Sequence, residues 1–301
     1  MPVSHLLLAL AVVAVWGTNF VVIRWALLEL PPFTLAALRF ALSAWPLVMF
    51  LPRPAVPWRQ LASFGVLLGV GQFGLLFLAM RSDIAPGLAS LVVQTQVLFT
   101  LALAWALRGE RLRPVQAPGL LLAVAGMAWI GLHAAQDGQA LGQGSVSPLG
   151  LGLVLAAALC WGGANLVARA AGRVDALAFM AWSSLFAVPP LVLLAGLMDG
   201  GPAQVQQALM HASPGAWAAV AWQAVGNTLF GYGAWNWLLA RHAPATITPT
   251  ALLVPVFGMA SAAAWLGEPL PAWKLGAAAL VLGGLVWNLW VSRPAAATRA
   301  A

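Results

Sequence analysis

The sequence predicts an all-α integral membrane protein with ten transmembrane helices, arranged as two five-helix repeats of inverted topology around a central cavity. Three observations predict this. Hydrophobic residues make up 62% of the 301 residues and charged residues only 7%, against about 25% in an ordinary soluble domain. The apolar residues form ten runs, each near the roughly 20 residues that cross a bilayer. Short motifs of the first five runs return, in order, in the second five.

The ten apolar runs are separated mostly by short connections that often contain proline. They cover about 5–28, 32–51, 61–80, 86–107, 114–132, 148–171, 175–197, 215–240, 244–266 and 272–291. The stretch between the fifth and sixth runs is rich in Gly, Gln and Ser, which is typical of a linker. We therefore expect a first repeat over 5–133, a linker over 134–147 and a second repeat over 148–291.

Basic residues are distributed unequally between the two predicted sides of the membrane. With the N-terminus placed on side one, the loops of that side hold ten Arg or Lys residues and the loops of the other side hold three. Short basic loops stay in the cytoplasm, so both termini are predicted to be cytoplasmic. The same bias explains the net charge of +7, so the lipid bilayer rather than a nucleic acid is the expected partner.

Three motifs recur in the same order along the two halves. They are WGTNFVVIR at 16–24 with WGGANLVAR at 161–169, GVGQF at 69–73 with AVGNT at 224–228, and GERL at 109–112 with GEPL at 267–270. Their spacing grows from 145 to 158 positions, which places inserted residues in loops, chiefly in 198–214. Five helices is an odd number, so the second copy would cross the membrane in the opposite direction. Inverted repeats with a site between them are typical of secondary transporters.

Amide and aromatic side chains occur near the middle of several predicted helices. Such groups are unfavourable against hydrocarbon, so we expect them to face protein or a water-filled cavity. For any one amide, a hydrogen bond that joins two helices is an equal alternative, worth ~0.6 kcal/mol. As a set from both repeats they favour a common substrate-binding cavity. The candidates are Trp16, Asn19, Gln72, Gln94, Trp161, Asn165, Gln223, Asn227 and Tyr232.

Arg39 falls inside the second apolar run. An arginine at that depth costs about 2.5–3.5 kcal/mol on insertion scales, so it should have a specific role. It could bind a substrate carboxylate through two parallel hydrogen bonds, or it could anchor helix ends by donating to backbone carbonyls. The sequence leaves both roles open.

All acids and histidines fall at predicted helix ends or in loops. Proton relays usually use such groups within the membrane, so the sequence argues for facilitated diffusion, exchange, or coupling through a group near a gate. Glu110 and Glu268 occupy matching positions of the repeats and are candidate gate or capping residues, with Arg111, Arg113 or Lys274 nearby. Pro255 interrupts the ninth run and is a candidate hinge. With one cysteine in the chain, we expect no metal site and no cofactor.

The motifs WGTNFVVIRWAL, LAALRF, PGLASLVVQTQVLFT, GERL and LLVPVFGM resemble those of the EamA branch of the drug/metabolite transporter superfamily. The resemblance covers essentially the whole chain as two EamA units and is strongest to bacterial EamA/YddG-type exporters of amino acids and related metabolites. It implies a bacterial inner-membrane location, a five-plus-five inverted arrangement and alternating access. The second unit departs from the first, because WGGAN places its asparagine one position later, so exact mirror symmetry at the cavity is not expected.

The sequence thus leaves cargo, energy coupling and oligomeric state open and predicts a secondary transporter that exports amino acids or related small amphipathic metabolites. A multidrug or cationic-compound exporter is the alternative, since aromatic walls hold cations, but the buried carboxylate it would need is missing from the apolar runs. A membrane-embedded enzyme would need a nucleophile and a base, or metal ligands, at one depth. The apolar runs contain no such set, so catalytic activity is not expected.

Overall fold

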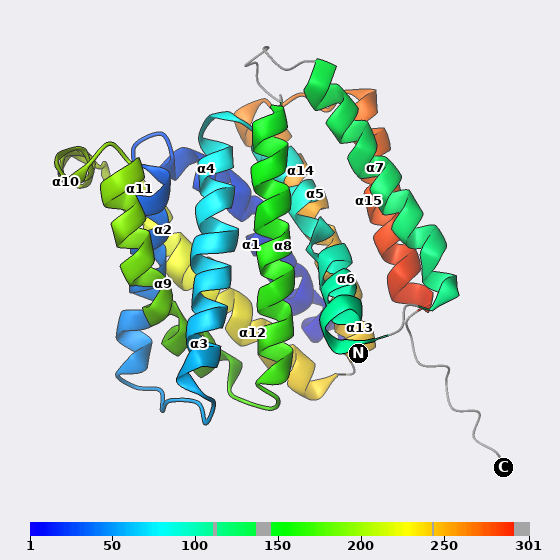
Figure 1. Ribbon diagram of the computed structural model, residues 1–301, viewed down its shortest axis with the longest axis horizontal. Coiled ribbons are helices and arrows are strands. Elements are labelled where there is room, and N and C mark those ends of the chain that lie inside the picture. The colour runs from blue at the N-terminus through cyan, green and yellow to red at the C-terminus, as the bar shows by residue number, and fades with distance from the viewer. Residues whose placement is uncertain (111–112, 137–145, 243, 292–301) are drawn as a thin grey trace.

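The computed structural model describes residues 1–110, 113–136, 146–242 and 244–291, which fold into helices with no strand among them (Figure 1). The first half contains α1 (Val3–Ala26), α2 (Pro32–Val48), α3 (Trp58–Gly65), α4 (Leu75–Ser82), α5 (Pro86–Val92), α6 (Gln96–Arg108) and α7 (Ala117–Gln136). The second half contains α8 (Pro148–Ala170), α9 (Ala176–Met198), α10 (Pro202–His211), α11 (Pro214–Ala221), α12 (Gly231–Arg241), α13 (Pro244–Ile247), α14 (Val254–Leu266) and α15 (Ala272–Val291). Most of the predicted linker, 137–145, lies outside the described residues.

Several of these helices continue into one another through irregular helical segments. A π-helix, Val66–Gly74, joins α3 to α4, and a second, Trp222–Phe230, joins α11 to α12. A 3-10 turn, Val93–Thr95, joins α5 to α6, and a longer 3-10 segment, Thr248–Leu253, joins α13 to α14. The 3-10 turn Pro114–Gln116 leads into α7.

Eight continuous helical segments are long and apolar enough to cross a membrane. They are Val3–Ala26, Trp58–Ser82, Pro86–Arg108, Pro114–Gln136, Pro148–Ala170, Ala176–Met198, Thr248–Leu266 and Ala272–Val291. Two further predicted spans are either too short or not apolar enough to be counted with these eight. Pro32–Val48 is apolar but shorter, and 214–241 carries polar side chains such as Gln223, Asn227 and Asn236 that lower its hydropathy. The chain is therefore a multi-pass helical membrane protein.

The irregular segments recur at matching places in the two halves. The two π-helices have nine residues each and begin 156 positions apart. Gly109 and Gly267 end α6 and α14 with φ of 65° and 67°. The next residues, Glu110 and Glu268, donate their backbone N–H to Ala104 and Ala262 at 3.3 and 3.2 Å. A glycine in the left-handed conformation is a common C-terminal cap of a helix.

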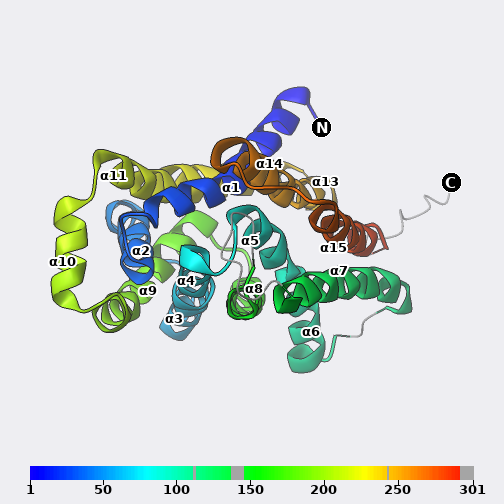
Figure 2. The same cartoon turned by 90° about the horizontal axis from the view of Figure 1, so that it is seen from above.

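The tightest helix pairs each join one helix of the first half to one of the second. They are α2 with α9, α7 with α15, α1 with α14, and α6 with α8; Figure 2 shows α7 and α15 side by side at one edge. Small residues allow these close approaches. A Cβ added to Gly17 would lie 2.5 Å from the Val254 carbonyl oxygen, and one added to Gly119 would lie 2.6 Å from that of Gly284.

Residues 198–214, where the repeat spacing predicts inserted residues, contain α10 (Pro202–His211). This helix spans from α9 to α11 at the edge opposite α7 and α15 (Figure 2), and none of its residues is buried.

Candidate functional site

A cavity of about 430 Å³ is lined by both halves of the chain, a size within the range of small-molecule sites. Its walls come from α1, α4, α6, α8, α12, α14, α15, both π-helices and the 3-10 segments that begin at Val93 and Thr248. Eight of the nine residues that the sequence proposes for a central cavity line this one: Trp16, Asn19, Gln72, Gln94, Trp161, Asn165, Asn227 and Tyr232. The ninth, Gln223, has no exposed surface and lies outside the lining.

The irregular helical segments supply cavity residues. Gln72 and Asn227 lie in the two π-helices, Gln94 in Val93–Thr95, and Thr248 at the start of Thr248–Leu253. Irregular backbone is tolerated at membrane depth where it lines a cavity or is covered by protein. Here a side chain covers part of it, because Trp16 Nε1 donates to the Asn227 carbonyl at 3.1 Å.

Two cavity amides form the helix-joining hydrogen bonds that the sequence allows as an alternative. Asn165 Nδ2 donates to Gln96 Oε1 at 2.7 Å and to Thr100 Oγ1 at 3.2 Å, so it joins α8 to α6. Gln94 Nε2 donates to the Ala251 carbonyl at 3.2 Å. Both side chains therefore hold the walls together.

Two other cavity amides have an unsatisfied oxygen. Asn19 and Gln72 are 3% and 4% exposed, and neither Asn19 Oδ1 nor Gln72 Oε1 has a hydrogen-bond partner among the described residues. A buried acceptor without a partner costs about 1–3 kcal/mol. Both side chains line the cavity, so their amide groups are candidates to hydrogen-bond a bound molecule.

Aromatic rings form one wall of the cavity. The Trp16 indole lies with its centroid 5.6 Å from that of Tyr232 and 5.1 Å from that of Trp235, within the range of favourable ring contacts. Gly231 makes room for this indole, since a Cβ there would lie 2.3 Å from Trp16 Nε1. Sequence reasoning missed Trp235, although it follows Tyr232 by three residues and so lies on the same helix face.

Arg39 lies behind the cavity and is 2% exposed. Its guanidinium carbon is 3.7 Å from the centroid of the Phe73 ring, and Phe73 itself lines the cavity. Its nitrogens donate to Gln223 Oε1 at 3.4 Å and Thr228 Oγ1 at 3.5 Å. These partners are side chains of the second half rather than the backbone carbonyls that a helix-end anchor would use.

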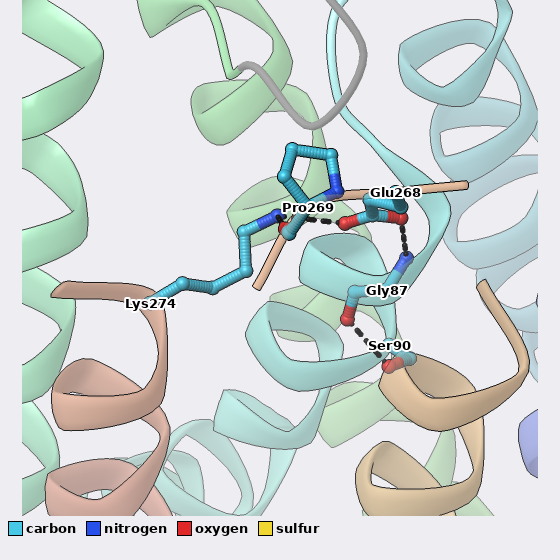
Figure 3. A network of polar contacts seen from close by, with 5 residues as sticks. All are labelled: Gly87, Ser90, Glu268, Pro269 and Lys274. Atoms are coloured by element: carbon cyan, nitrogen blue, oxygen red, sulfur yellow. Dashed lines mark hydrogen bonds and ion pairs between the residues drawn. The ribbon is translucent and has the colours of Figure 1, made fainter. Parts of the chain in front are cut away.

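Glu268 lies in a buried polar cluster where α14 ends (Figure 3). Its Oε1 is 2.8 Å from Lys274 Nζ, and the two side chains are 3% and 0% exposed. Its Oε2 accepts the backbone N–H of Gly87, in the first turn of α5, at 2.9 Å. Lys274 also donates to the Pro269 carbonyl at 3.0 Å, and Ser90 Oγ donates to the Gly87 carbonyl at 2.6 Å.

Glu110, the counterpart of Glu268, has a different environment. Its carboxylate pairs with Arg169 at the end of α8, and both side chains are about half exposed. Of the partners expected from the sequence, Lys274 is found on Glu268. Arg113 instead donates to the Val291 carbonyl at 3.2 Å, and Arg111 lies outside the described residues.

Pro255 is the second residue of α14, directly after the 3-10 segment Thr248–Leu253. The irregular backbone therefore precedes Pro255, which occupies a position in the first turn where its missing N–H is not needed. Within the described ranges, no three His, Cys, Asp or Glu residues come together as metal ligands.

A multi-pass helical protein with a mixed amide and aromatic cavity between two similar halves has the structure of a small-molecule transporter. The chain belongs to the EamA-like transporter family, whose model matches residues 3–132 and 148–290. It is therefore a transporter and not an enzyme.

Curated relatives agree with this family over nearly the whole chain. It is 38% identical over 287 residues to a probable amino-acid metabolite efflux pump of Salmonella typhimurium, covering 94% of each chain. A protein with the same description from Escherichia coli is 36% identical over the same share. A probable terminal-alkyne amino-acid exporter of Streptantibioticus cattleyicolor is 28% identical over 91% of this chain and 89% of its own. A solved crystal structure, 21% identical, has the same fold, with a TM-score of 0.63 over 98% of this chain and 99% of that one.

Proposed function

We propose that this protein exports amino acids or related small amphipathic metabolites across the bacterial inner membrane by alternating access. The observation that carries the proposal is the cavity, whose wall combines the amide side chains of Asn19 and Gln72 with the rings of Trp16, Tyr232 and Trp235. Such a space suits a molecule with a polar head and an apolar body. The amino-acid metabolite efflux pumps at 36–38% identity support this class of cargo.

Within this proposal the cavity residues have different roles in binding. Asn19, Gln72 and Asn227 bind the polar head, while the rings of Trp16, Trp161 and Tyr232 contact the apolar body. The contacts described above support a wall-forming task for Gln94 and Asn165. Gln223 acts indirectly, through Arg39.

The proposed architecture has ten membrane-crossing segments in two inverted five-helix repeats, with 214–241 and Pro32–Val48 as the two additional spans. The paired π-helices, the paired left-handed glycine caps at Gly109 and Gly267, and the cross-half helix pairs support it. Alternating access then arises from the two repeats moving against each other about the cavity.

Both termini are expected in the cytoplasm. Fusions of alkaline phosphatase, which is active only outside the cytoplasm, to residue 291 and to residue 146 provide the measurement. We expect an inactive fusion at 291 and an active fusion at 146, because these positions lie on opposite sides of the proposed membrane. The reverse pattern would invert the proposed orientation, and two fusions of equal activity would contradict an odd number of spans between them.

Counterflow in proteoliposomes tests the function. Vesicles preloaded with one unlabelled amino acid at a time should accumulate the same amino acid in labelled form, with and without a pH gradient. A parallel series with cationic dyes tests the multidrug alternative, which the cavity does not favour because no Asp or Glu is among its described lining residues. Gln206→Ala, on the exposed surface of α10, is the matched amide control and should transport as the parent does. If no amino acid shows counterflow, the proposed function is wrong.

A further inference from the structure

Arg39 is a buried cation that has no carboxylate partner among the described residues. The ion pairs in that part of the chain join Glu110 to Arg169 and Glu268 to Lys274. A guanidinium has five N–H donors, and the two acceptors near Arg39 lie at 3.4 and 3.5 Å, beyond the usual 2.7–3.2 Å. The positive charge is therefore poorly compensated by its neighbours.

The Phe73 ring separates this charge from the cavity. The guanidinium lies 3.7 Å from the ring centroid, and Phe73 is part of the cavity wall. Water-poor surroundings screen a charge weakly, so the field of Arg39 extends through the ring into the cavity. No described lining residue is Asp or Glu to cancel it.

We propose that Arg39 sets the charge selectivity of the cavity: it favours cargo that carries a free carboxylate and rejects cargo whose net charge is positive. This rests on the proposed transport of amino acids. The head group lies along Val66–Gly74, with its carboxylate near Phe73 and its ammonium beside the amide groups of Gln72 and Asn19. Arg39 is then a positioning residue that acts through the field in the cavity, because it does not itself line the wall.

A purely structural arginine would give a different result. Arg39 also links α2 to both π-helices through Phe73, Gln223 and Thr228, so its loss can lower stability or overall flux. Only the charge-selectivity role changes the ratio between two cargoes of the same shape and different charge.

The test compares leucine and phenylalanine with leucinamide and phenylalaninamide, which lack the carboxylate, as inhibitors of amino-acid counterflow. In the parent protein the amides should inhibit at least tenfold more weakly. Arg39→Gln should reduce that ratio to below threefold, and Arg39→Lys should retain it. An unchanged ratio in Arg39→Gln would overturn the proposal, whereas a parent protein without counterflow would instead refute the proposed function.

Phe73→Leu keeps the proposal testable if Arg39→Gln does not fold. Removing the ring takes away the barrier between the guanidinium and the cavity, so the acid-to-amide ratio should rise above that of the parent. An equal or smaller ratio in this variant would also overturn the proposal.

The two matching glutamates carry a second, independent inference. Their backbones are alike, since each follows the left-handed glycine that ends its helix. Glu268 is nevertheless buried on Gly87 and Lys274, whereas Glu110 is exposed on Arg169. The surrounding helices, not the local turns, produce this difference.

The helical segments near the two glutamates also differ in burial. All seven residues of α5, which Glu268 caps, are buried. In the other half Ile247 of α13 is buried, but the segment Thr248–Leu253 that follows it has no buried residue, and Thr248, Ala251 and Leu252 line the cavity. Glu110 follows the other end of the continuous helix Pro86–Arg108, about 33 Å from Gly87 at 1.5 Å per residue. The segment that Glu268 caps is therefore the more buried one, and Thr248–Leu253 is the less covered one.

The geometry points to a switch between two conformational states. In each state one of the two glutamates acts as a latch, because it holds the first turn of a helix in the other half of the chain. In the state seen here Glu268 closes its end by holding the first turn of α5. In the opposite state Glu268 releases Gly87, and Glu110 leaves Arg169 to accept a backbone N–H in the first turn of α13 (Pro244–Ile247), which matches α5 at the same 158-position spacing.

Cysteine accessibility tests the exchange in a Cys160→Ser background. Ser90→Cys reports on the latched end, and Leu252→Cys reports on the cavity wall at the other end. With a membrane-impermeant maleimide applied from each side, Glu268→Gln should raise labelling of Ser90→Cys about tenfold and lower labelling of Leu252→Cys. Glu110→Gln should leave Ser90→Cys as protected as in the parent, or more so.

Local unfolding would raise labelling at both reporters, and this outcome would overturn the latch, as would identical labelling in Glu268→Gln and the parent. Gly87→Ala is the second variant if Glu268→Gln does not fold. An added Cβ lies 3.0 Å from Glu268 Oε1, so it should weaken the same contact and move the two reporters in the same opposite directions.

Discussion

Replacing both Asn19 and Gln72 by leucine is expected to lower amino-acid counterflow at subsaturating cargo by about a hundredfold. Each lost hydrogen bond to a charged cargo group is worth about 1.5–3 kcal/mol, and both amide side chains line the same cavity. The folded protein should be as stable as the parent or more stable, because two unsatisfied buried acceptors are removed. Counterflow rates and thermal stability in detergent measure the two effects separately.

Asn165→Leu provides the contrast to this pair. Asn165 donates to Gln96 and Thr100, so its loss removes contacts between α8 and α6 and should lower stability. If the Asn19 and Gln72 variant transports normally, these amides do not contact cargo. If it loses stability to the same extent as Asn165→Leu, their oxygens have partners in the membrane-embedded protein.

Lys274→Met is expected to destabilise the protein by about 3–5 kcal/mol, because it leaves the buried carboxylate of Glu268 without its cation. The pair is 2.8 Å apart, with side chains 0% and 3% exposed. Combining it with Glu268→Gln should restore most of the stability, since the neutral amide leaves no unpaired charge in the buried cluster. Unfolding in mixed detergent micelles provides the measurement.

Arg169→Met is the matched control, because it breaks the exposed ion pair with Glu110. Exposed pairs contribute about 0–1 kcal/mol, so this variant should unfold close to the parent. Equal losses in Arg169→Met and Lys274→Met would show that the Glu268 pair is solvated, and would contradict the buried cluster of Figure 3.

Much of the site follows from the sequence because a polar side chain within an apolar run has few favourable positions. That restriction is why eight proposed residues, from Trp16 to Tyr232, line one cavity. The same argument does not separate Asn165, which joins helices, from Asn19, whose oxygen has no partner. That distinction depends on which side chains the neighbouring helices bring within reach.

The irregular helical segments could not be predicted from the sequence, and they change which side chains share a helix face. Gln223 and Asn227 are four residues apart, a spacing that puts two side chains on one face of an α-helix. They lie in a π-helix, where the repeating hydrogen bond spans five residues, and Thr228 Oγ1 accordingly donates to the Gln223 carbonyl at 2.9 Å. The hydropathy pattern does not reveal that each hydrogen-bonded turn of a π-helix contains one residue more than that of an α-helix. The partner of Glu110 is likewise set by tertiary contact, since Arg169 lies 59 positions away.

The matching glycine caps of α6 and α14 have a consequence for the balance between the two states of the transporter. Since Glu110 and Glu268 have the same local turn, the turns contribute equally to both states and cancel in their free-energy difference. The resting population is then set by the unlike partners, Lys274 and Gly87 at one end and Arg169 at the other. Every 1.4 kcal/mol added to or removed from one end changes the population ratio tenfold. Single substitutions at either end can therefore set which side of the membrane the empty protein faces.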